Sequence, residues 1–251
     1  MEMLKKPDSE RRPRAEQISR AAFQRLPRYH QILSVYDGFG RKYISSKELS
    51  EMLEINETLV RKDMADLEIR GRQNQGYPVV PFRKRIEEFL GLLDRTDAVL
   101  IGAGRLGQAL SLYPGFENYG LRIIGLFDSD PQKLGTWVGE HQVRSLDALA
   151  PIITDGVVKL AILTVPKDAA QSIADMCVRS GVRAIWNFTP SEISVPKGVM
   201  VRNEQIIAGF MTLSFFLKNL GREADPPEYQ ETGPDMPDDH EGATSSILGT
   251  A

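Results

Sequence analysis

The feature that most constrains the fold is a glycine motif, G-x-G-x-x-G, formed by Gly102, Gly104 and Gly107. It follows the apolar run AVLI and opens the helix-like stretch RLGQAL. The first glycine permits a tight turn, the second lets a pyrophosphate approach the backbone, and the third lets helix and strand pack closely. Free N–H groups at the start of the helix would then point at the phosphates. The motif therefore predicts a dinucleotide-binding turn between a strand and a helix.

An acidic residue supports this interpretation. Asp128 ends the next apolar run, LRIIGLFD, and lies 21 residues after Gly107. A carboxylate at about this distance binds the adenosine ribose hydroxyls. Because it would repel a 2′-phosphate, we predict NAD+ and NADH as cofactors rather than their phosphorylated forms. The alternative is a doubly wound domain whose glycines serve only packing.

Apolar runs alternate with helix-like stretches between residues 97 and 201, which is typical of a parallel sheet covered on both faces. Ligands of such sheets lie outside the carboxyl ends of the strands, where TVP (164–166) and NFTP (187–190) fall. Their residues could line the ribose or nicotinamide end, or could equally be strand-ending turn residues. The predicted cofactor contacts are Gly102, Ala103, Gly104, Arg105, Leu106, Gly107, Asp128, Thr164, Val165, Pro166, Asn187 and Phe188.

Composition places the chain among ordinary globular proteins. Of its 251 residues, 41% are hydrophobic and 26% charged, and the single cysteine excludes a disulfide framework. The polar N-terminus lacks the apolar stretch of a secretory signal, and no apolar run approaches the ~18 residues of a membrane span. We therefore expect a cytoplasmic protein without membrane contact.

The sequence offers little for catalysis. A dehydrogenase needs an acid/base group near the nicotinamide. None of the three histidines, His30, His141 and His240, follows a late strand, and Lys167 is expected on a solvated helix start. No metal-ligand cluster is apparent. We expect no enzymatic activity and no metal site, and a small oxidoreductase remains the less favoured alternative.

The first third of the chain has helix–turn–helix proportions. Residues 1–90 hold 18 Lys and Arg against 14 Asp and Glu, whereas residues 222–251 hold one against eight. A helix beginning with a capping box at Ser45 and Glu48 precedes a second helix that Asn56 can cap. The first turns of such a second helix meet base edges in the major groove. The alternatives are a solvated basic face or a small helical docking module.

The stretch IRGRQNQGY, which follows the second helix, is predicted to form a wing. Arg70 and Arg72 at its tip could enter a minor groove or contact phosphates. In the second helix, Arg61 can bind guanine with two hydrogen bonds, and Lys62 can bind guanine or phosphate. The predicted DNA contacts are Ser46, Thr58, Arg61, Lys62, Arg70, Arg72, Gln73 and Tyr77.

Over residues 16–220 the chain resembles the Rex family of redox-sensing transcriptional repressors. The matching segments are RLPRYHQIL, ISSKELSEML, VRKDM, the GY of the wing, GAGRLGQAL, YPGF, FDSDPQKLG, LTVP, NFTP and VPKGVMVRN. The resemblance implies an α/β fold, with a winged-helix domain, a Rossmann domain and a C-terminal helix swapped between two subunits. It also implies a homodimer that binds palindromic operator DNA when NADH is low and leaves it when NADH rises.

The resemblance adds Tyr113 to the cofactor site, because the tyrosine of YPGF is implicated in sensing the reduced state. Three departures from the family pattern stand out. Gln73 and Asn74 replace an arginine and a glycine of the wing, although Asn tolerates a positive φ. Gln205 stands where an aspartate couples Tyr113 to the DNA-binding domain, and Gly209 stands where a glutamate is usual. A regulator with an altered or lost NADH response is therefore the alternative function.

The predicted organisation has five parts. Residues 1–14 and the acidic tail 221–251 are expected to be disordered. The winged-helix domain spans 15–90, the Rossmann domain 91–201, and the swapped dimerisation helix 202–220. The last of these is apolar on all sides, so it requires burial on all sides.

Overall fold

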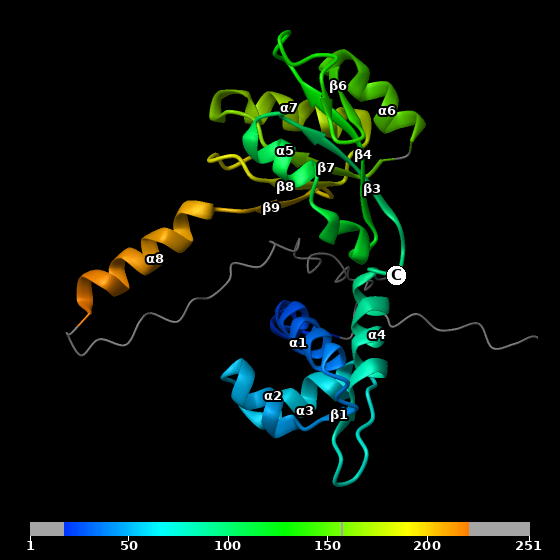
Figure 1. Cartoon of the computed structure of the whole chain (residues 1–251), viewed down its shortest axis with the longest axis vertical. Helices are drawn as coiled ribbons and strands as arrows, with labels where there is room; N and C mark the ends of the chain where they lie inside the picture. Colours follow the sequence, from blue (N-terminus) through cyan, green and yellow to red (C-terminus); the bar gives the residue numbers. More distant parts are fainter. Residues whose placement is uncertain (1–17, 157, 221–251) are drawn as a thin grey trace, which may run out of the picture. The chain divides into compact units, whose positions relative to one another are not determined.

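The structure is a computed structural model that describes residues 18–156 and 158–220. The predicted disorder of 1–14 and 221–251 lies outside the described residues. The chain divides into two compact units, Met1–Asp94 and Arg95–Ala251. In Figure 1 the first unit contains the helices α1 to α4, and the second contains the larger of the two sheets.

The first unit is a small helical domain with a two-stranded sheet. Its elements are α1 (Arg20–Gly38), β1 (Tyr43–Ile44), α2 (Ser46–Leu53), α3 (Glu57–Asp66), β2 (Tyr77–Pro78) and α4 (Val79–Leu90). The β1 and β2 strands pair antiparallel. The core is formed by apolar side chains from all four helices, among them Leu33, Leu49, Met64 and Phe82. The helix–turn–helix and wing expected from the sequence are therefore present.

Local sequence signals account for the starts of α2 and α3. The Ser45 side chain accepts the N–H of Glu48 at 3.1 Å, and the Glu48 carboxylate accepts the N–H of Ser45 at 2.8 Å. Asn56 accepts the N–H of Thr58 at 2.7 Å. The predicted capping box and the Asn56 cap are both confirmed. Each satisfies backbone donors that the first turn of a helix leaves unpaired.

Pro27 lies inside α1, although a proline usually interrupts a helix. Proline lacks an N–H and disfavours a helix interior by about 3 kcal/mol. In the structure α1 nevertheless continues through Pro27. Leu26, Tyr29 and Leu33 lie on one face and are fully buried against the rest of the unit. Burying one such side chain contributes about 1.5–3 kcal/mol, so packing on both sides of Pro27 outweighs the local preference.

The second unit is a doubly wound α/β domain. Its described strands are β3 (Thr96–Ile101), β4 (Leu121–Asp128), β5 (Trp137–Val138), β6 (His141–Ser145), β7 (Leu160–Leu163), β8 (Ala184–Asn187) and β9 (Met200–Asn203). They form one sheet in the order β5-β6-β4-β3-β7-β8-β9. The strands pair in parallel, except that β5 pairs antiparallel with β6.

Helices cover both faces of this sheet, as expected from the alternating pattern (Figure 1). The helical elements are α5 (Arg105–Ser111), the 3-10 helices η2 (Pro114–Tyr119) and η3 (Leu146–Ala148), α6 (Leu149–Asp155) and α7 (Lys167–Ser180). One core cluster joins α6 and α7 to the sheet, and another places α5 and η2 on the opposite face. Strand order reverses beside β3, so the carboxyl ends of β3 and β7 frame the crevice where this fold binds ligands.

The last described element is α8 (Ile206–Asn219), which confirms one apolar helix in this region. Large apolar side chains along its length are exposed, including Ile206 at 70%, Phe210 at 62% and Leu217 at 65%. None of its residues is buried. Apolar side chains repeated along a whole helix are stable only when another surface covers them.

Candidate functional site

The glycine turn has the geometry that a phosphate loop needs. Gly102 has φ +107°, and a Cβ there would lie 2.7 Å from the Thr164 carbonyl oxygen. A Cβ at Gly107 would overlap the carbonyl oxygen of Gly102. A Cβ at Gly104 would meet no atom within 4 Å, so the space above this residue is open. The first and third glycines are thus required by packing, while the second leaves room for a ligand.

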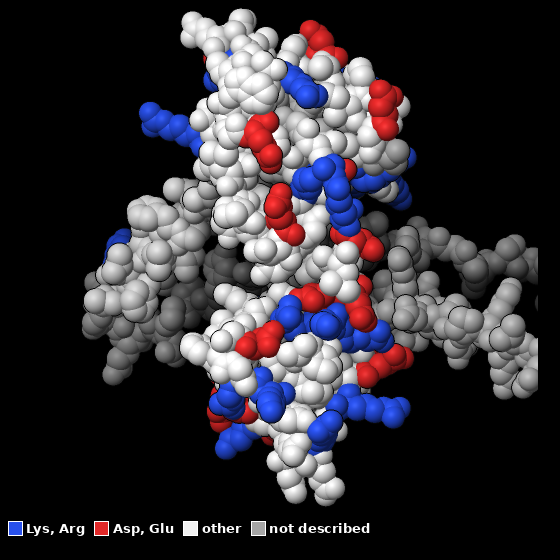
Figure 2. Space-filling model, turned by 45° about the vertical axis from the view of Figure 1, so that its right-hand side comes forward, with Lys and Arg blue, Asp and Glu red and all other residues white. Residues whose placement is uncertain are grey.

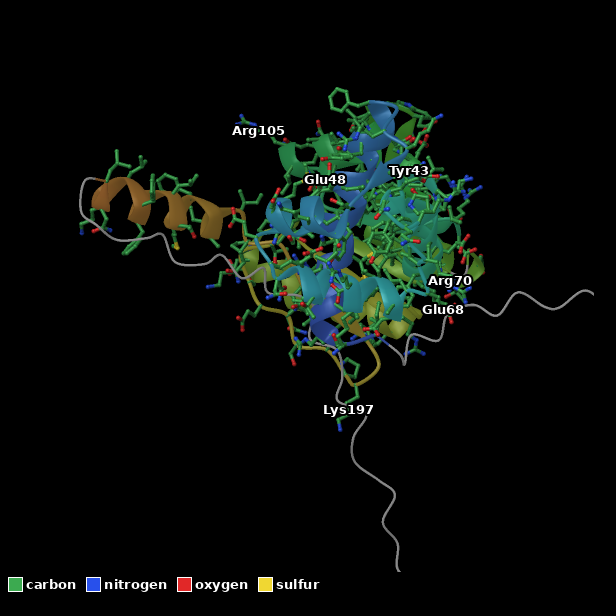
Figure 3. The ribbon with its side chains drawn as sticks, turned by 90° about the horizontal axis from the view of Figure 1, so that it is seen from below. Tyr43, Glu48, Glu68, Arg70, Arg105 and Lys197 are labelled. Carbon is green, nitrogen blue, oxygen red and sulfur yellow. The ribbon has the colours of Figure 1, made fainter. Side chains whose placement is uncertain are left out.

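Gly104 also caps α5, with no side chain to satisfy the first N–H groups of the helix. These donors favour an anion such as a pyrophosphate. Arg105 and Leu106 follow in the first turn, and both are exposed. Figure 3 shows Arg105 projecting away from the ribbon. Ala103 is buried, so it can offer a ligand its backbone only.

Asp128 ends β4 and is held by three donors. Its carboxylate accepts the N–H of Ala103 at 2.7 Å, the N–H of Asp130 at 2.9 Å and the Lys133 Nζ at 2.9 Å. Burial alone would raise the pKa of Asp128, but these hydrogen bonds and the Lys133 charge bring it below the ordinary value. The group is therefore a carboxylate at neutral pH, as recognition of ribose hydroxyls requires.

Lys133 was missed from the sequence, although it lies only five residues after Asp128. Its ammonium group pairs with Asp128 at 2.9 Å and approaches Asp130 at 3.8 Å. A cation here offsets part of the charge that would repel a 2′-phosphate. The preference between NAD(H) and its 2′-phosphorylated form therefore depends on the Asp128–Lys133 ion pair and not on Asp128 alone.

The residues that follow β7 and β8 differ in their contacts and in their exposure. The Thr164 hydroxyl lies 2.8 Å from the carbonyl oxygen of Gly102 and ties the glycine loop to β7. Val165 packs on the core, and Pro166 is exposed at the start of α7. Asn187 is fully buried and bonds to Ser191, Asn203 and Thr189. Those bonds favour the alternative in which Asn187 ends its strand, while Phe188 is only partly buried.

Tyr113 is 57% exposed and packs edge-on against Phe116 at a ring separation of 4.9 Å. It lines a cavity of about 350 Å³ together with Phe116, Arg122 and His141. None of the residues lining this cavity belongs to the glycine loop. Tyr113 is thus accessible, and its place in the cofactor site remains a prediction.

The helix–turn–helix presents a compact polar cluster. Arg61 pairs with Glu57 at 2.6 Å, and the Ser46 hydroxyl donates to the same carboxylate at 2.6 Å. The Ser46 hydroxyl and then Arg61 lower the pKa of Glu57 below its usual value. Glu57 was missed, although its spacing of four residues from Arg61 on one helix could have indicated the pair. Thr58 and Lys62 are exposed on the same helix.

The wing forms a tight turn. The N–H of Arg72 donates to the Gly76 carbonyl at 2.7 Å, and that of Gly76 donates back at 3.1 Å. Asn74 adopts φ +59°, so the turn tolerates the replacement of glycine. The Arg72 guanidinium lies 5.4 Å from the centre of the Tyr43 ring. Arg70 and Gln73 are exposed, and Figure 3 shows Arg70 near Glu68 on the outside of the ribbon.

Tyr77 differs from the other predicted DNA contacts because its ring is partly buried and packs against the core of the first unit. It packs edge-on against Phe82 at a ring separation of 6.1 Å, and burial raises the pKa of its hydroxyl. Figure 2 shows Lys and Arg side chains gathered on the first unit, interspersed with acidic ones. Among the predicted DNA contacts, the exposed basic side chains are Arg61 and Lys62 of α3 and Arg70 and Arg72 of the wing.

Family models match both units. One described as "CoA binding domain" matches residues 94–191, and one described as "Putative DNA-binding protein N-terminus" matches residues 17–65. None of the helices in residues 18–156 and 158–220 combines the length and hydropathy needed to cross a membrane.

Named relatives and a solved structure share most of the chain. The redox-sensing transcriptional repressor Rex of Clostridioides difficile is 37% identical over 80% of this chain and 96% of its own length. That of Treponema denticola is 39% identical over 77% of this chain and 92% of its own. The Rex-family repressor RSP, in complex with β-NAD+ and operator DNA, matches with a TM-score of 0.74 at 34% identity. The matched region covers 82% of this chain and 99% of the RSP chain.

RSP has a further structure in complex with β-NADH, which matches with the same TM-score and covers 81% of this chain. The similarity spans both units and the glycine turn between β3 and α5. The chain belongs to the Rex family of redox-sensing transcriptional repressors.

Proposed function

We propose that this chain is a DNA-binding repressor that senses the NADH/NAD+ ratio. It occupies operator DNA when NADH is low and leaves it when NADH rises. The observation that carries the proposal is that one chain combines a winged helix with a glycine turn and a buried carboxylate, Asp128, at the end of β4, where we expect the adenosine ribose to bind. The complexes of RSP with operator DNA, β-NAD+ and β-NADH support it. A transcriptional regulator acts where the DNA is, so we assign the chain to the cytoplasm.

The cofactor would bind across the carboxyl ends of β3, β4 and β7. The N–H groups at Gly104 and Arg105 would hold the pyrophosphate, and Asp128 the adenosine ribose. Phe188 and Tyr113 would lie at the nicotinamide end. The chain's own groups thus bind and orient the dinucleotide, and we assign no group to chemistry on it.

DNA would be bound by α3 and the wing. Arg61 would reach a guanine edge, and Lys62, Arg70 and Arg72 would contact phosphates or the minor groove. Leaving Glu57 costs Arg61 one ion pair, which at an exposed site is worth only about 0.2–1 kcal/mol. Arg61 is therefore available to a base.

We further propose five functional segments with the boundaries predicted from the sequence, and a homodimer that exchanges α8. The exposed apolar length of α8 supports this exchange. A homodimer with two-fold symmetry would bind a palindromic operator.

Departures from the family pattern favour one alternative, a regulator with an altered NADH response. Gln205 and Gly209 occupy positions where the family has carboxylates, and Gln205 directly precedes α8. Calorimetry separates the two functions. Equal NADH affinities of the free and the operator-bound protein would favour the alternative, because a ligand with equal affinity for two states does not shift the equilibrium between them.

The decisive experiment measures DNA affinity with NADH titrated in. Operator sequences are first selected from random duplexes by the cofactor-free protein, and binding is then followed by fluorescence anisotropy. NADH should weaken binding about tenfold or more, within the usual range of coupling between sites. NAD+ at the same concentration is the control. Unchanged operator affinity in NADH would contradict the proposal even if NADH binds.

A further inference from the structure

Four aromatic rings form a continuous row on the α5 face of the sheet. Tyr113 and Phe116 are 4.9 Å apart between ring centroids, Phe116 and Trp186 are 5.5 Å apart, and Trp186 and Phe188 are 5.0 Å apart. The row joins η2 to the end of β8. Phe116, Trp186 and Phe188 are partly buried and Tyr113 is exposed, and each ring packs against the next, so a displacement at either end of the row changes the packing of Trp186.

Trp186 is the ring of this row that also donates a hydrogen bond to the residue directly after β9. Its indole Nε1 donates to Glu204 Oε1 at 3.0 Å, and Arg202 Nε donates to the same oxygen at 3.0 Å. The Glu204 N–H donates to the Asn187 carbonyl at 2.8 Å. Hydrogen bonds to an ionised acceptor are about twice as strong as neutral ones. Side chain and backbone therefore both fix Glu204 to β8.

Glu204 also sets where the last helix begins. It directly precedes Gln205, the N-cap of α8, and the Gln205 side chain makes no capping hydrogen bond. Within its own unit α8 makes no buried contact, so the segment after β9 is what joins this helix to its own sheet. In a dimer that exchanges α8, a shift of Glu204 would change the angle between the exchanged helix and the sheet from which it comes.

We propose that Trp186 and Glu204 form the joint through which the oxidation state of the bound nicotinamide sets the position of α8. The inference rests on the proposed function, in which Phe188 and Tyr113 lie at the nicotinamide end. Both ends of the ring row are then in reach of the cofactor, and Trp186 lies between them. A ligand shifts an equilibrium only by its differential interaction with the two states, and the row supplies such an interaction.

Three substitutions distinguish a loss of coupling through Trp186 and Glu204 from a general loss of stability. Trp186→Phe keeps a ring but removes the N–H donor, and Glu204→Ala removes the acceptor. Glu204→Gln keeps an acceptor oxygen and is the conservative control. Trp137→Phe, at a tryptophan that is 67% exposed, is the matched control for the first. For each protein, NADH affinity, operator affinity without cofactor, and operator affinity in saturating NADH are measured.

Trp186→Phe and Glu204→Ala should keep the first two affinities within about threefold of wild type and reduce the effect of NADH on operator affinity about tenfold, a coupling loss in the usual range. Glu204→Gln and Trp137→Phe should retain most of that effect. In the Trp137→Phe background, where Trp186 is the remaining tryptophan, Glu204→Ala should also change how its emission maximum responds to NADH as against NAD+.

The inference is overturned by a full NADH response in both Trp186→Phe and Glu204→Ala. It is equally overturned if Glu204→Ala loses NADH affinity, because the pair would then serve binding rather than coupling. A wild-type protein whose operator affinity ignores NADH overturns the proposed function as well. The wild-type measurement therefore distinguishes the two failures.

Discussion

The Asp128 carboxylate accepts the backbone N–H of Ala103 at 2.7 Å, which joins the end of β4 to the glycine loop. The two residues are 25 positions apart, and their hydrogen bond holds the glycine loop after β3 to the end of the neighbouring strand β4. The same carboxylate holds the Lys133 ammonium at 2.9 Å. Loop geometry and local charge thus depend on one side chain.

Asp128→Ala should weaken NADH binding about tenfold or more, since a hydrogen bond to a charged group is worth about 1.5–3 kcal/mol. It should weaken NADPH binding less, because the freed Lys133 can face the 2′-phosphate. Calorimetry with both cofactors gives the two ratios. Asp130→Ala, at the more distant partner of Lys133, is the control, and an unchanged NADH/NADPH preference in Asp128→Ala would remove Asp128 from the ribose site.

Two glycines of one motif should respond differently to substitution. Gly104→Val should leave the melting temperature nearly unchanged and abolish cofactor binding, because its Cβ enters space that protein atoms leave open. Gly107→Ala should lower the free energy of unfolding by about 1–3 kcal/mol, the usual cost of overpacking. Thermal unfolding and NADH titration are run on both. Retained NADH affinity in Gly104→Val would show that the pyrophosphate binds elsewhere.

Arg61→Ala should weaken operator binding by about 1–3 kcal/mol, the range for one good base contact. Its effect on random duplex DNA should be much smaller. Lys62→Ala is the matched control on the same helix, with a loss that is similar for all sequences and a shallower salt dependence. Fluorescence anisotropy with competing random DNA, at several salt concentrations, distinguishes the effect of Arg61→Ala from that of Lys62→Ala. Equal losses on operator and random DNA in Arg61→Ala would place it on phosphate instead.

Leu213→Glu on α8 should convert a dimer to a monomer, because burying a carboxylate in an apolar interface is strongly unfavourable. Leu213 is 61% exposed within one chain, so the substitution should not disturb the chain's own fold. Lys218→Glu near the end of the same helix is the control. Sedimentation equilibrium gives the mass, and a dimeric Leu213→Glu protein would argue that other surfaces associate.

Asp63 tests the stability of the first unit. It is 1% exposed, pairs with Arg25 at 2.6 Å and accepts the Tyr29 hydroxyl at 2.9 Å. Asp63→Ala should cost about 3–5 kcal/mol, because it removes the buried carboxylate and leaves the partly buried Arg25 guanidinium without its counter-charge and the Tyr29 hydroxyl without its acceptor. Glu51→Ala, in an exposed pair with Lys47, should cost less than about 1 kcal/mol. Urea unfolding measures both, and similar costs would mean that the buried pair contributes little.

Local features were predictable because their causes lie within a few residues. The capping box at Ser45, the Asn56 cap and the glycine turn each depend on neighbours in sequence, and all three are present. The alternation of strands and helices and the carboxyl-end position of Asp128 follow from patterns of similar length. The family resemblance, which predicted both domains, also depends on short segments of sequence.

Contacts between distant residues were decided only by the tertiary structure. Arg25 and Asp63 are 38 positions apart, and Trp186 and Glu204 are 18 apart. Nothing in either local sequence specifies the partner, because a charge or ring finds its contact only after the chain has packed. The continuity of α1 through Pro27 has the same origin, since the burial of Leu26 and Tyr29 outweighs a local preference. The sequence by itself determined which elements form and what the glycine turn is suited to bind. The tertiary structure decided which side chains support that turn, because packing and pairing between distant segments are properties of the folded chain.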